Sequence, residues 1–233
     1  MNYAKPRNYF FWNNRMTTQT PQQHFEQSVA AAIAVFPGNR FTQLIDEEAI
    51  AVADYHRLLL MIFHQTFRAP QSFALAGAMM HERHLAARTY LITHAAEEHT
   101  HWQWALNDLE KTGYTGADPR LSTPPPACAA YIGFNYYISL QHPIARLAIA
   151  SVLEGLGATY SKPYAMKVAK QLQLKPEQMV FFLGHSDTDV VHTQDIRDVI
   201  AKSALTVDEW QWMSCAATTA GKLYTDMYDE AAG

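Results

Sequence analysis

Residues 44–67 read LIDEEAIAVADYHRLLLMIFHQTF and contain neither glycine nor proline. Apolar side chains recur along this stretch at the spacing of one face of an α-helix, at Leu44, Ile50, Ala51, Tyr55, Leu58, Leu59 and Ile62. The pattern predicts a long amphipathic helix that begins after Arg40 and ends near Phe67. A helix of this length at the start of the chain favours an all-α fold.

The remaining sequence also favours helices, because long stretches lack glycine and proline and none alternates as a half-buried strand does. Turn-forming residues divide it into helices expected at 23–36, from Pro70 to Lys111 with an internal break, and at 128–140, 143–160, 163–172 and 176–203. Thr206 and Glu209 form a capping-box pattern that opens a last helix. We expect one compact all-α domain of seven to nine helices at residues 23–233, after an irregular arm at residues 1–22.

The composition argues against several classes of function. Of the 233 residues, 48% are apolar and 17% are charged, which suits one domain with a substantial core. A formal net charge of -4 without a basic run argues against nucleic acid as a partner. The longest apolar runs are too short to span a bilayer, and residues 1–15 lack the apolar core of a signal peptide. We therefore expect a cytoplasmic protein with neither a membrane nor a nucleic-acid partner.

A cluster of histidines and acids is the strongest indication of chemistry. In the sequence His185-Ser-Asp-Thr-Asp189-Val-Val-His192, three ligand-type side chains have the spacing i, i+4 and i+7. On a helix these positions fall within about 60° of one another. Two imidazoles and one carboxylate suit iron, manganese or zinc better than calcium or magnesium.

Two further segments carry similar side chains. In His94-Ala-Ala-Glu97-Glu98-His99-Thr100-His101, the residues His94, Glu98 and His101 repeat the i, i+4, i+7 spacing, while Glu97 and His101 offer an alternative pair. Glu154 is the only acid in the apolar stretch 144–160. An ionised carboxylate is costly to bury on such a helix unless it is paired or binds a metal.

Each segment also has an ordinary structural explanation. The acids near Glu98 would then form the solvated face of a helix, and Glu154 would pair with Arg146. Taken together, however, the three segments offer three carboxylates and three imidazoles, a number that suits two irons with open positions for O2. Helical bundles hold dinuclear iron with inward-facing carboxylates and Glu-x-x-His pairs, and Glu98 with His101 has that form.

From about Phe41 to Leu205 the sequence resembles the heme-oxygenase-like diiron oxidases, which share a fold with thiaminase II and pyrroloquinoline-quinone synthase. The resemblance rests on the order and spacing of the three segments. It implies two Fe(II) ions per chain with six ligands, namely Glu98, His101, Glu154, His185, Asp189 and His192. His94 and Glu97 remain alternatives to Glu98. Candidates for a further carboxylate ligand are Glu47, Glu48, Asp54 and Glu82.

The resemblance implies an O2-activating non-heme diiron oxidase or oxygenase. Such an enzyme oxidises a small organic substrate, amino-acid-like or fatty-acid-like, through a peroxo-diferric intermediate. We expect catalytic roles for Glu154, Tyr55 and Tyr160, and a carboxylate anchor at Arg146 or Lys162. No flavin or nicotinamide fingerprint is present, so electrons would come from the substrate or an external donor. We also expect a homodimer.

Two other functions remain open at this point. One is a metal-free hydrolase like thiaminase II, with Glu154 and a tyrosine as acid and base. It would need a nucleophilic cysteine, and neither Cys128 nor Cys215 is well placed for that role. The other is a carrier of heme or another small molecule, with His24 or His56 as the axial ligand. The metal content of the protein separates these functions from an oxidase.

Overall fold

The computed structural model describes residues 19–233, apart from the side chains of residues 186 and 187. Within this part the chain is helical and forms no β-strand. The α-helical segments are α1 (Pro21–Val35), α2 (Arg40–Asp46), α3 (Val52–Met79), α4 (Leu85–Glu98), α5 (Trp102–Lys111), α6 (Pro126–Gln141), α7 (Arg146–Leu156), α8 (Lys162–Leu172), α9 (Val180–Lys202) and α10 (Val207–Ala231). A π turn (Gly157–Ser161) joins α7 to α8, so the described chain has nine helices, one of them bent. The predicted all-α fold of seven to nine helices is confirmed.

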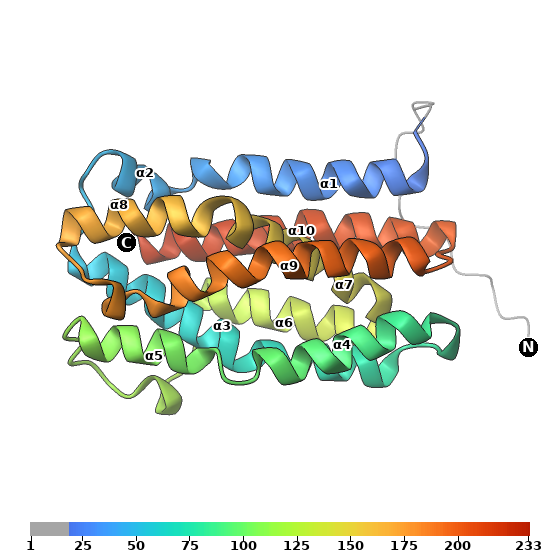
Figure 1. Cartoon of the computed structure of the whole chain (residues 1–233), viewed down its shortest axis with the longest axis horizontal. Coiled ribbons are helices and arrows are strands. Elements are labelled where there is room, and N and C mark those ends of the chain that lie inside the picture. Colours follow the sequence, from blue (N-terminus) through green and yellow to red (C-terminus); the bar gives the residue numbers. More distant parts are fainter. Residues whose placement is uncertain (1–18) are drawn as a thin grey trace, which may run out of the picture.

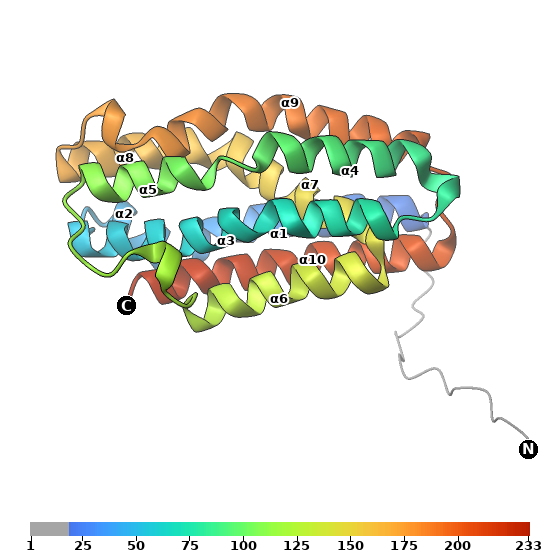
Figure 2. The same cartoon turned by 90° about the horizontal axis from the view of Figure 1, so that it is seen from below.

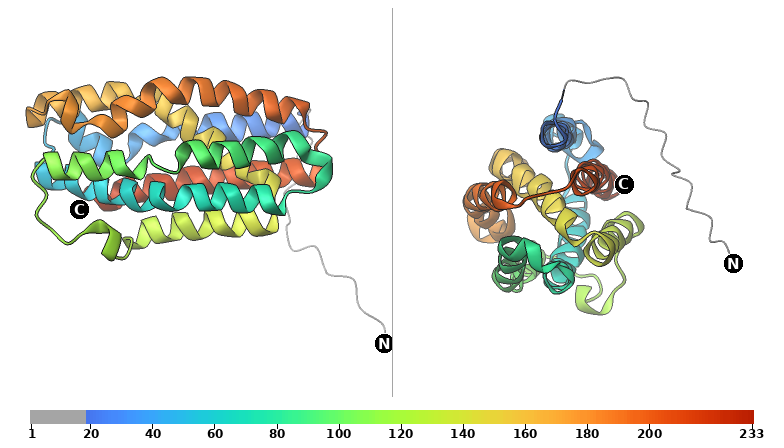
Figure 3. Two further views of the ribbon diagram at one scale, coloured as in Figure 1. Left: turned by 60° about the horizontal axis from the view of Figure 1, so that its bottom comes forward. Right: turned by 90° about the vertical axis from the view of Figure 1, so that its right-hand side faces the viewer.

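α7 lies at the centre of the bundle. Most helices run along the long axis of the molecule (Figure 1), and the end-on view in Figure 3 shows α7 crossing the middle of the ring. α7 packs against α1, α9 and α10. Nine of its eleven residues are buried, including Arg146 and Glu154. Charged side chains on this helix therefore face the interior of the protein and need partners there.

The long helix expected from Arg40 to Phe67 is wrong at its beginning, because α2 and α3 are separate helices. α2 ends where Glu48 adopts a left-handed φ of 55°, and the amide of Ala49 bonds back to the carbonyl of Leu44 at 2.8 Å. The chain restarts when the Asp54 carboxylate accepts a hydrogen bond from the amide of Ala51 at 2.7 Å. The local capping interactions thus outweigh the apolar periodicity.

Pro70 was expected to open a helix, but it lies inside α3. A proline in this position removes the hydrogen bond to the carbonyl of Thr66, four residues earlier. α3 continues to Met79 because its middle is buried, and packing of that face offsets the missing bond.

Capping boxes open both the first and the last helix, and the sequence predicted the one at the last helix. Thr206 and Glu209 form the expected box, in which Thr206 Oγ1 accepts from the Glu209 amide and Glu209 Oε2 accepts from the Thr206 amide. α1 begins at Pro21, two residues before the expected helix start, because Thr20 and Gln23 form a similar box. Residues 1–18, most of the expected arm, lie outside the described residues.

The interruption between α4 and α5 lies between two of the predicted metal ligands. Figure 2 shows the two helices end to end beside α9, with which both are in contact. The interruption falls at residues 99–101, between Glu98, which ends α4, and His101, the N-cap of α5. An internal break was expected between Pro70 and Lys111 without a stated position, and one break of the structure separates Glu98 from His101. Among residues 19–233, no helix is both long enough and apolar enough to cross a membrane.

Candidate metal centre

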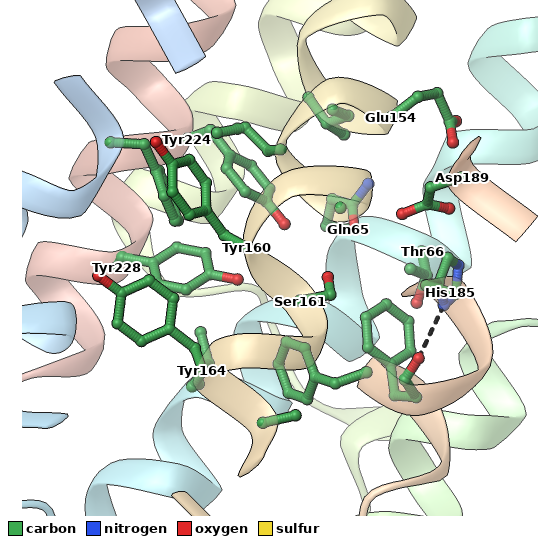
Figure 4. A pocket seen from close by; sticks show the side chains of 18 of the residues that line it. Gln65, Thr66, Glu154, Tyr160, Ser161, Tyr164, His185, Asp189, Tyr224 and Tyr228 are labelled. Carbon is green, nitrogen blue, oxygen red and sulfur yellow. Dashed lines mark hydrogen bonds between the residues drawn. The ribbon is translucent and has the colours of Figure 1, made fainter. Parts of the chain in front are cut away.

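Four helices bring the predicted ligand residues together in the core. α4 supplies Glu98, the start of α5 supplies His101, and α7 supplies Glu154. α9 supplies His185, Asp189 and His192 from successive turns of one face. Figure 4 shows the side chains of Glu154, Asp189 and His185 near one another on one side of a cavity. All six predicted ligands therefore converge, although their binding of iron remains a prediction.

The first half of the site is built around the Glu98 carboxylate. Its Oε2 atom lies 2.8 Å from His101 Nδ1 and 3.8 Å from His185 Nε2. The other ring nitrogen of His185 lies 3.0 Å from the carbonyl of Phe181, to which it donates a hydrogen bond. This bond orients the imidazole and leaves Nε2 as the free donor atom that faces Glu98, as in many metal-ligating histidines.

The second half of the site is built around Glu154. One carboxylate oxygen lies 3.4 Å from His94 Nε2, and the other lies 3.4 Å from His192 Nδ1. Asp189 approaches the same carboxylate from α9. The sequence suggested His94 only as an alternative to Glu98, but the structure brings both side chains to the cluster. Its spacing of four residues before Glu98 was the feature that pointed to it.

The two halves overlap through shared residues. Potential ligand atoms lie within 4.8 Å of one another in three groups of three, namely Glu98 with His101 and His185, Glu98 with His94 and His192, and Glu154 with Asp189 and His192. Glu98 and His192 each belong to two groups. An arrangement of overlapping groups suits two neighbouring ions better than one.

The carboxyl groups of the site differ in their protonation. Burial favours the neutral form of Glu98, but the neighbouring imidazoles of His101 and His185 prevail and hold its pKa below the usual range. Burial also opposes ionisation of Glu154, and attraction to His192 and His94 outweighs it and lowers the pKa. Burial raises the pKa of Asp189, and the negative charge of Glu154 raises it further. Without a metal, a proton on Asp189 therefore offsets the crowding of negative charge.

Several side-chain nitrogen and oxygen atoms that could bind a metal have no hydrogen-bond partner. Both ring nitrogens of His94, the Oδ1 atom of Asp189 and the Nδ1 atom of His192 are buried and form no hydrogen bond, although Glu154 oxygens lie 3.4 Å from two of these nitrogens. The unpaired state of a buried polar atom costs about 1–3 kcal/mol. A metal ion would bind atoms of this kind, and mixed carboxylate and imidazole ligands fit iron. The residues present therefore fit a dinuclear iron centre.

The remaining carboxylate candidates lie elsewhere. Glu97 lies at the rim with a half-exposed side chain, 3.6 Å from His94 Nδ1 and 3.7 Å from His192 Nε2. Asp54 caps α3 and pairs with Arg57. The other three, Glu47, Glu48 and Glu82, are exposed and do not line the cavity. Asp54, Glu47, Glu48 and Glu82 therefore lie outside the ligand groups, and Glu97 contacts two histidines of the cluster without belonging to a group.

A cavity of about 110 Å³ extends along α3 and the bent helix α7–α8, and its wall includes Glu98, Glu154, His185 and Asp189 of the cluster. The residues of α3 that line it extend from Tyr55 to Phe73, which corresponds to about 27 Å along a helix. Tyr160 also lines it, so both predicted catalytic tyrosines face the cavity. In Figure 4 four tyrosines lie across the cavity from the cluster, Tyr160, Tyr164, Tyr224 and Tyr228. Arg146 lines the cavity, whereas Lys162 is exposed and does not.

The cysteines considered for a hydrolase and the histidines considered as heme ligands lie away from this cavity. The thiol of Cys128 donates to the carbonyl of Met61, and burial raises its pKa to about 12, which is unsuitable for a nucleophile. Cys215 is exposed on α10. His24 lies against Ser214, and His56 bonds to Thr112, so neither lines the cavity.

The fold and the site define a class of protein, namely an all-helical bundle with a buried cluster of carboxylates and imidazoles beside a cavity. Residues 56–219 match the family described as iron-containing redox enzymes, and the chain belongs to this family. A comparison with curated proteins gives no match.

Solved structures agree on the fold. A domain of unknown function with a heme oxygenase-like fold from Shewanella denitrificans OS217 has a TM-score of 0.82 and 24% identity, over 88% of this chain and 89% of that one. A TenA homologue from P. horikoshii OT3 has a TM-score of 0.73 and 13% identity, over 92% and 100%. The heme oxygenase from Leptospira interrogans has a TM-score of 0.67 and 13% identity, over 91% and 100%. The predicted heme oxygenase-like fold is confirmed.

Proposed function

We propose that this protein is an O2-activating non-heme diiron oxidase or oxygenase that acts on a small organic substrate. The observation that carries the proposal is the set of overlapping ligand groups, which contains three carboxylates and four imidazoles at a buried cavity. Membership of a family of iron-containing redox enzymes supports it.

The donor sets divide naturally between two ions. His101 and His185 would hold one iron together with Glu98, and Glu154, Asp189 and His192 would hold the other. Glu98 and His94 lie in a group with His192 and would complete the second set. When bound there, two ferrous ions would supply electrons for the reduction of O2 and the oxidising power that acts on the substrate.

The protein itself contributes a water-poor site and fixed donors. Apolar residues of α3 and α7, among them Phe73, Ala150 and Leu153, line the cavity beside the cluster. Burial raises the pKa of Tyr55, so its hydroxyl stays protonated and acts as a hydrogen-bond donor rather than a base. Tyr160 brings a second hydroxyl to the same cavity. We expect an external electron donor where the substrate does not supply the electrons, and a homodimer.

The test is to purify the protein anaerobically, load it with Fe(II), count bound iron and record the optical spectrum after mixing with O2. We expect about two irons per chain and an O2-dependent visible band. His192→Ala should lower the iron content, and His99→Ala, which removes an exposed imidazole beside Glu98, should not. The absence of both bound iron and an O2 reaction would refute the oxidase function. Unchanged iron binding in His192→Ala would refute the ligand assignment alone.

A further inference from the structure

Arg146 is a buried cation without a carboxylate partner. Its side chain is 1% exposed and begins the central helix α7. The guanidinium lies 3.6 Å over the ring of Phe73, and its Nε atom donates to Ser72 Oγ at 3.2 Å. No described carboxylate forms an ion pair with it, and its Nη1 atom is buried without a hydrogen-bond partner. A buried guanidinium normally requires a paired anion.

Glu154 does not supply that anion. It lies on the same helix, and pairing of the two was one explanation for its burial, yet its oxygens face His94 and His192 instead. Burial lowers the pKa of Arg146 to about 10, so the side chain remains charged at neutral pH. Glu154 and Glu98 influence that charge electrostatically without contacting it. The guanidinium therefore lies near the metal cluster and has an unused donor.

Arg146 also lies at a definite place in the cavity. It lines the cavity beside Phe73, the last residue of the α3 lining, whereas Tyr55 is the first residue of that lining. Residues of the cluster, including Glu154 and Asp189, line the same cavity from α7 and α9. The walls beside Arg146 are mostly apolar. An elongated molecule with one anionic end would fill such a space.

The charge of the loaded site favours an anion. Two divalent ions exceed the three carboxylates of the cluster by one positive charge, and Arg146 adds a second. These charges lie in a buried region, where an unbalanced charge is costly. A planar guanidinium binds carboxylates particularly well because its N–H groups match the two oxygens.

We propose that Arg146 anchors the carboxylate group of the substrate, so that the substrate is an organic acid whose apolar body lies along the cavity beside the metal ligands. This inference rests on the proposed function for the role of the cluster. Both kinds of substrate considered above carry a carboxylate, and the inference assigns the binding of that group to Arg146 rather than to Lys162.

Binding of alkyl acids and their amides tests the assignment without turnover. Hexanoate, octanoate and decanoate would be titrated by calorimetry against the primary amides of equal length, with the full chain both metal-free and loaded with redox-inert Zn(II). The amides have the same shape but no negative charge. We expect at least one carboxylate to bind the zinc-loaded protein about 10-fold or more tightly than its amide.

Variants then locate the anchor. Arg146→Met should abolish the preference for the carboxylate while leaving amide binding unchanged, and Arg146→Lys should retain part of it. Lys162→Met, which removes an exposed cation outside the cavity, should behave as the wild type. The wild-type protein alone provides a test if Arg146→Met does not fold.

Three results would overturn the proposal. Equal binding of acid and amide by the wild type would show that the cavity does not select an anion. A preference that survives in Arg146→Met but disappears without zinc would make the metal the anchor. A preference lost in Lys162→Met would place the anchor outside the cavity. Failure of the chain to bind iron or zinc would refute the diiron function instead, and the metal-free titrations would still test Arg146 by itself.

Discussion

The Asp189 carboxylate occupies the space that a side chain on Gly157 would need. A Cβ atom at Gly157 would come within 1.6 Å of Asp189 Oδ2. Gly157 is the first residue of the π turn, three residues after Glu154. Because Gly157 has no side chain, α9 can bring Asp189 close to Glu154. π turns of this kind are frequent at functional sites.

Gly157→Ala should therefore damage the metal site specifically. The new methyl group would displace Asp189 from Glu154, and we expect iron affinity to fall about 10–100-fold, as for other changes that misplace a ligand. Gly133→Ala is the matched control, because a Cβ at Gly133 in α6 meets nothing within 4 Å. That control should keep full iron binding and gain roughly 0.5–1 kcal/mol of stability. Equal iron binding by the two variants would contradict the role assigned to Gly157.

Asp189→Asn should separate stability from metal binding. The raised pKa of Asp189 means that its contribution to the stability of the metal-free protein is complete below about pH 4 and is lost as the pH rises. Asparagine cannot ionise, so metal-free Asp189→Asn should be more stable at pH 7 by about 1 kcal/mol, or about 2–4 °C in Tm.

The same variant should bind less iron, because it lacks a carboxylate ligand. Thermal unfolding of the metal-free proteins between pH 4 and 8, beside iron counts at pH 7, measures both effects. The difference in Tm should shrink toward pH 4. A metal-free variant less stable than the wild type across this range would show that Asp189 stabilises the fold in another way.

Trp104 should hold the first half of the site in place. Its ring stacks on His101 with centroids 4.1 Å apart and meets the edge of His185 at 5.1 Å. Removal of this support in Trp104→Ala should weaken iron binding at the Glu98 half about 10–100-fold, so that one of two irons is lost first. Trp212→Ala is the control, because Trp212 stacks on His142, outside the cluster. Similar iron loss in both variants would indicate a general effect on folding.

The convergence of the ligands could be predicted because helical spacing is local. His185, Asp189 and His192 share a face for geometric reasons that depend only on the sequence between them. The family resemblance supplied the order of the three segments, and the apolar surroundings of Glu154 identified it as a buried acid. The all-α fold followed from the same local patterns.

Other features depend on contacts between distant segments, which the sequence pattern does not reveal. The interruption before His101 and the close contact of Gly157 with Asp189 both lie where α9 packs against other segments. Pro70 remains inside α3 because the buried face of that helix offsets a missing hydrogen bond. Arg146 lacks a carboxylate partner because Glu154 faces histidines of other helices, a relationship that local spacing does not contain.

Glu209 links the last helix to the segment before α4, and its effect should depend on pH. Its carboxylate accepts from the Thr206 amide at 2.8 Å, lies 2.8 Å from His84 Nε2 and pairs with Arg83. Burial alone would raise the pKa of Glu209, but the Thr206 amide, His84 and Arg83 together lower it to about 2. A carboxyl with a lowered pKa stabilises the folded protein above its usual pKa of about 4.3. This stabilisation is lost as the pH falls toward about 2.

Glu209→Gln keeps the capping box, because glutamine also accepts from the Thr206 amide, but it removes the charge. We expect a loss of about 1 kcal/mol at pH 7, since Arg83 is half exposed and solvent screens part of the attraction. Thermal unfolding from pH 7 to pH 3 measures this loss as about 2–4 °C in Tm, which should decrease steadily below pH 4.3. Glu177→Gln, a change at an exposed carboxylate, controls for the lost charge and should have little effect at any pH. A Tm difference for Glu209→Gln that stays constant down to pH 3 would mean that packing of the side chain, rather than its charge, stabilises this junction.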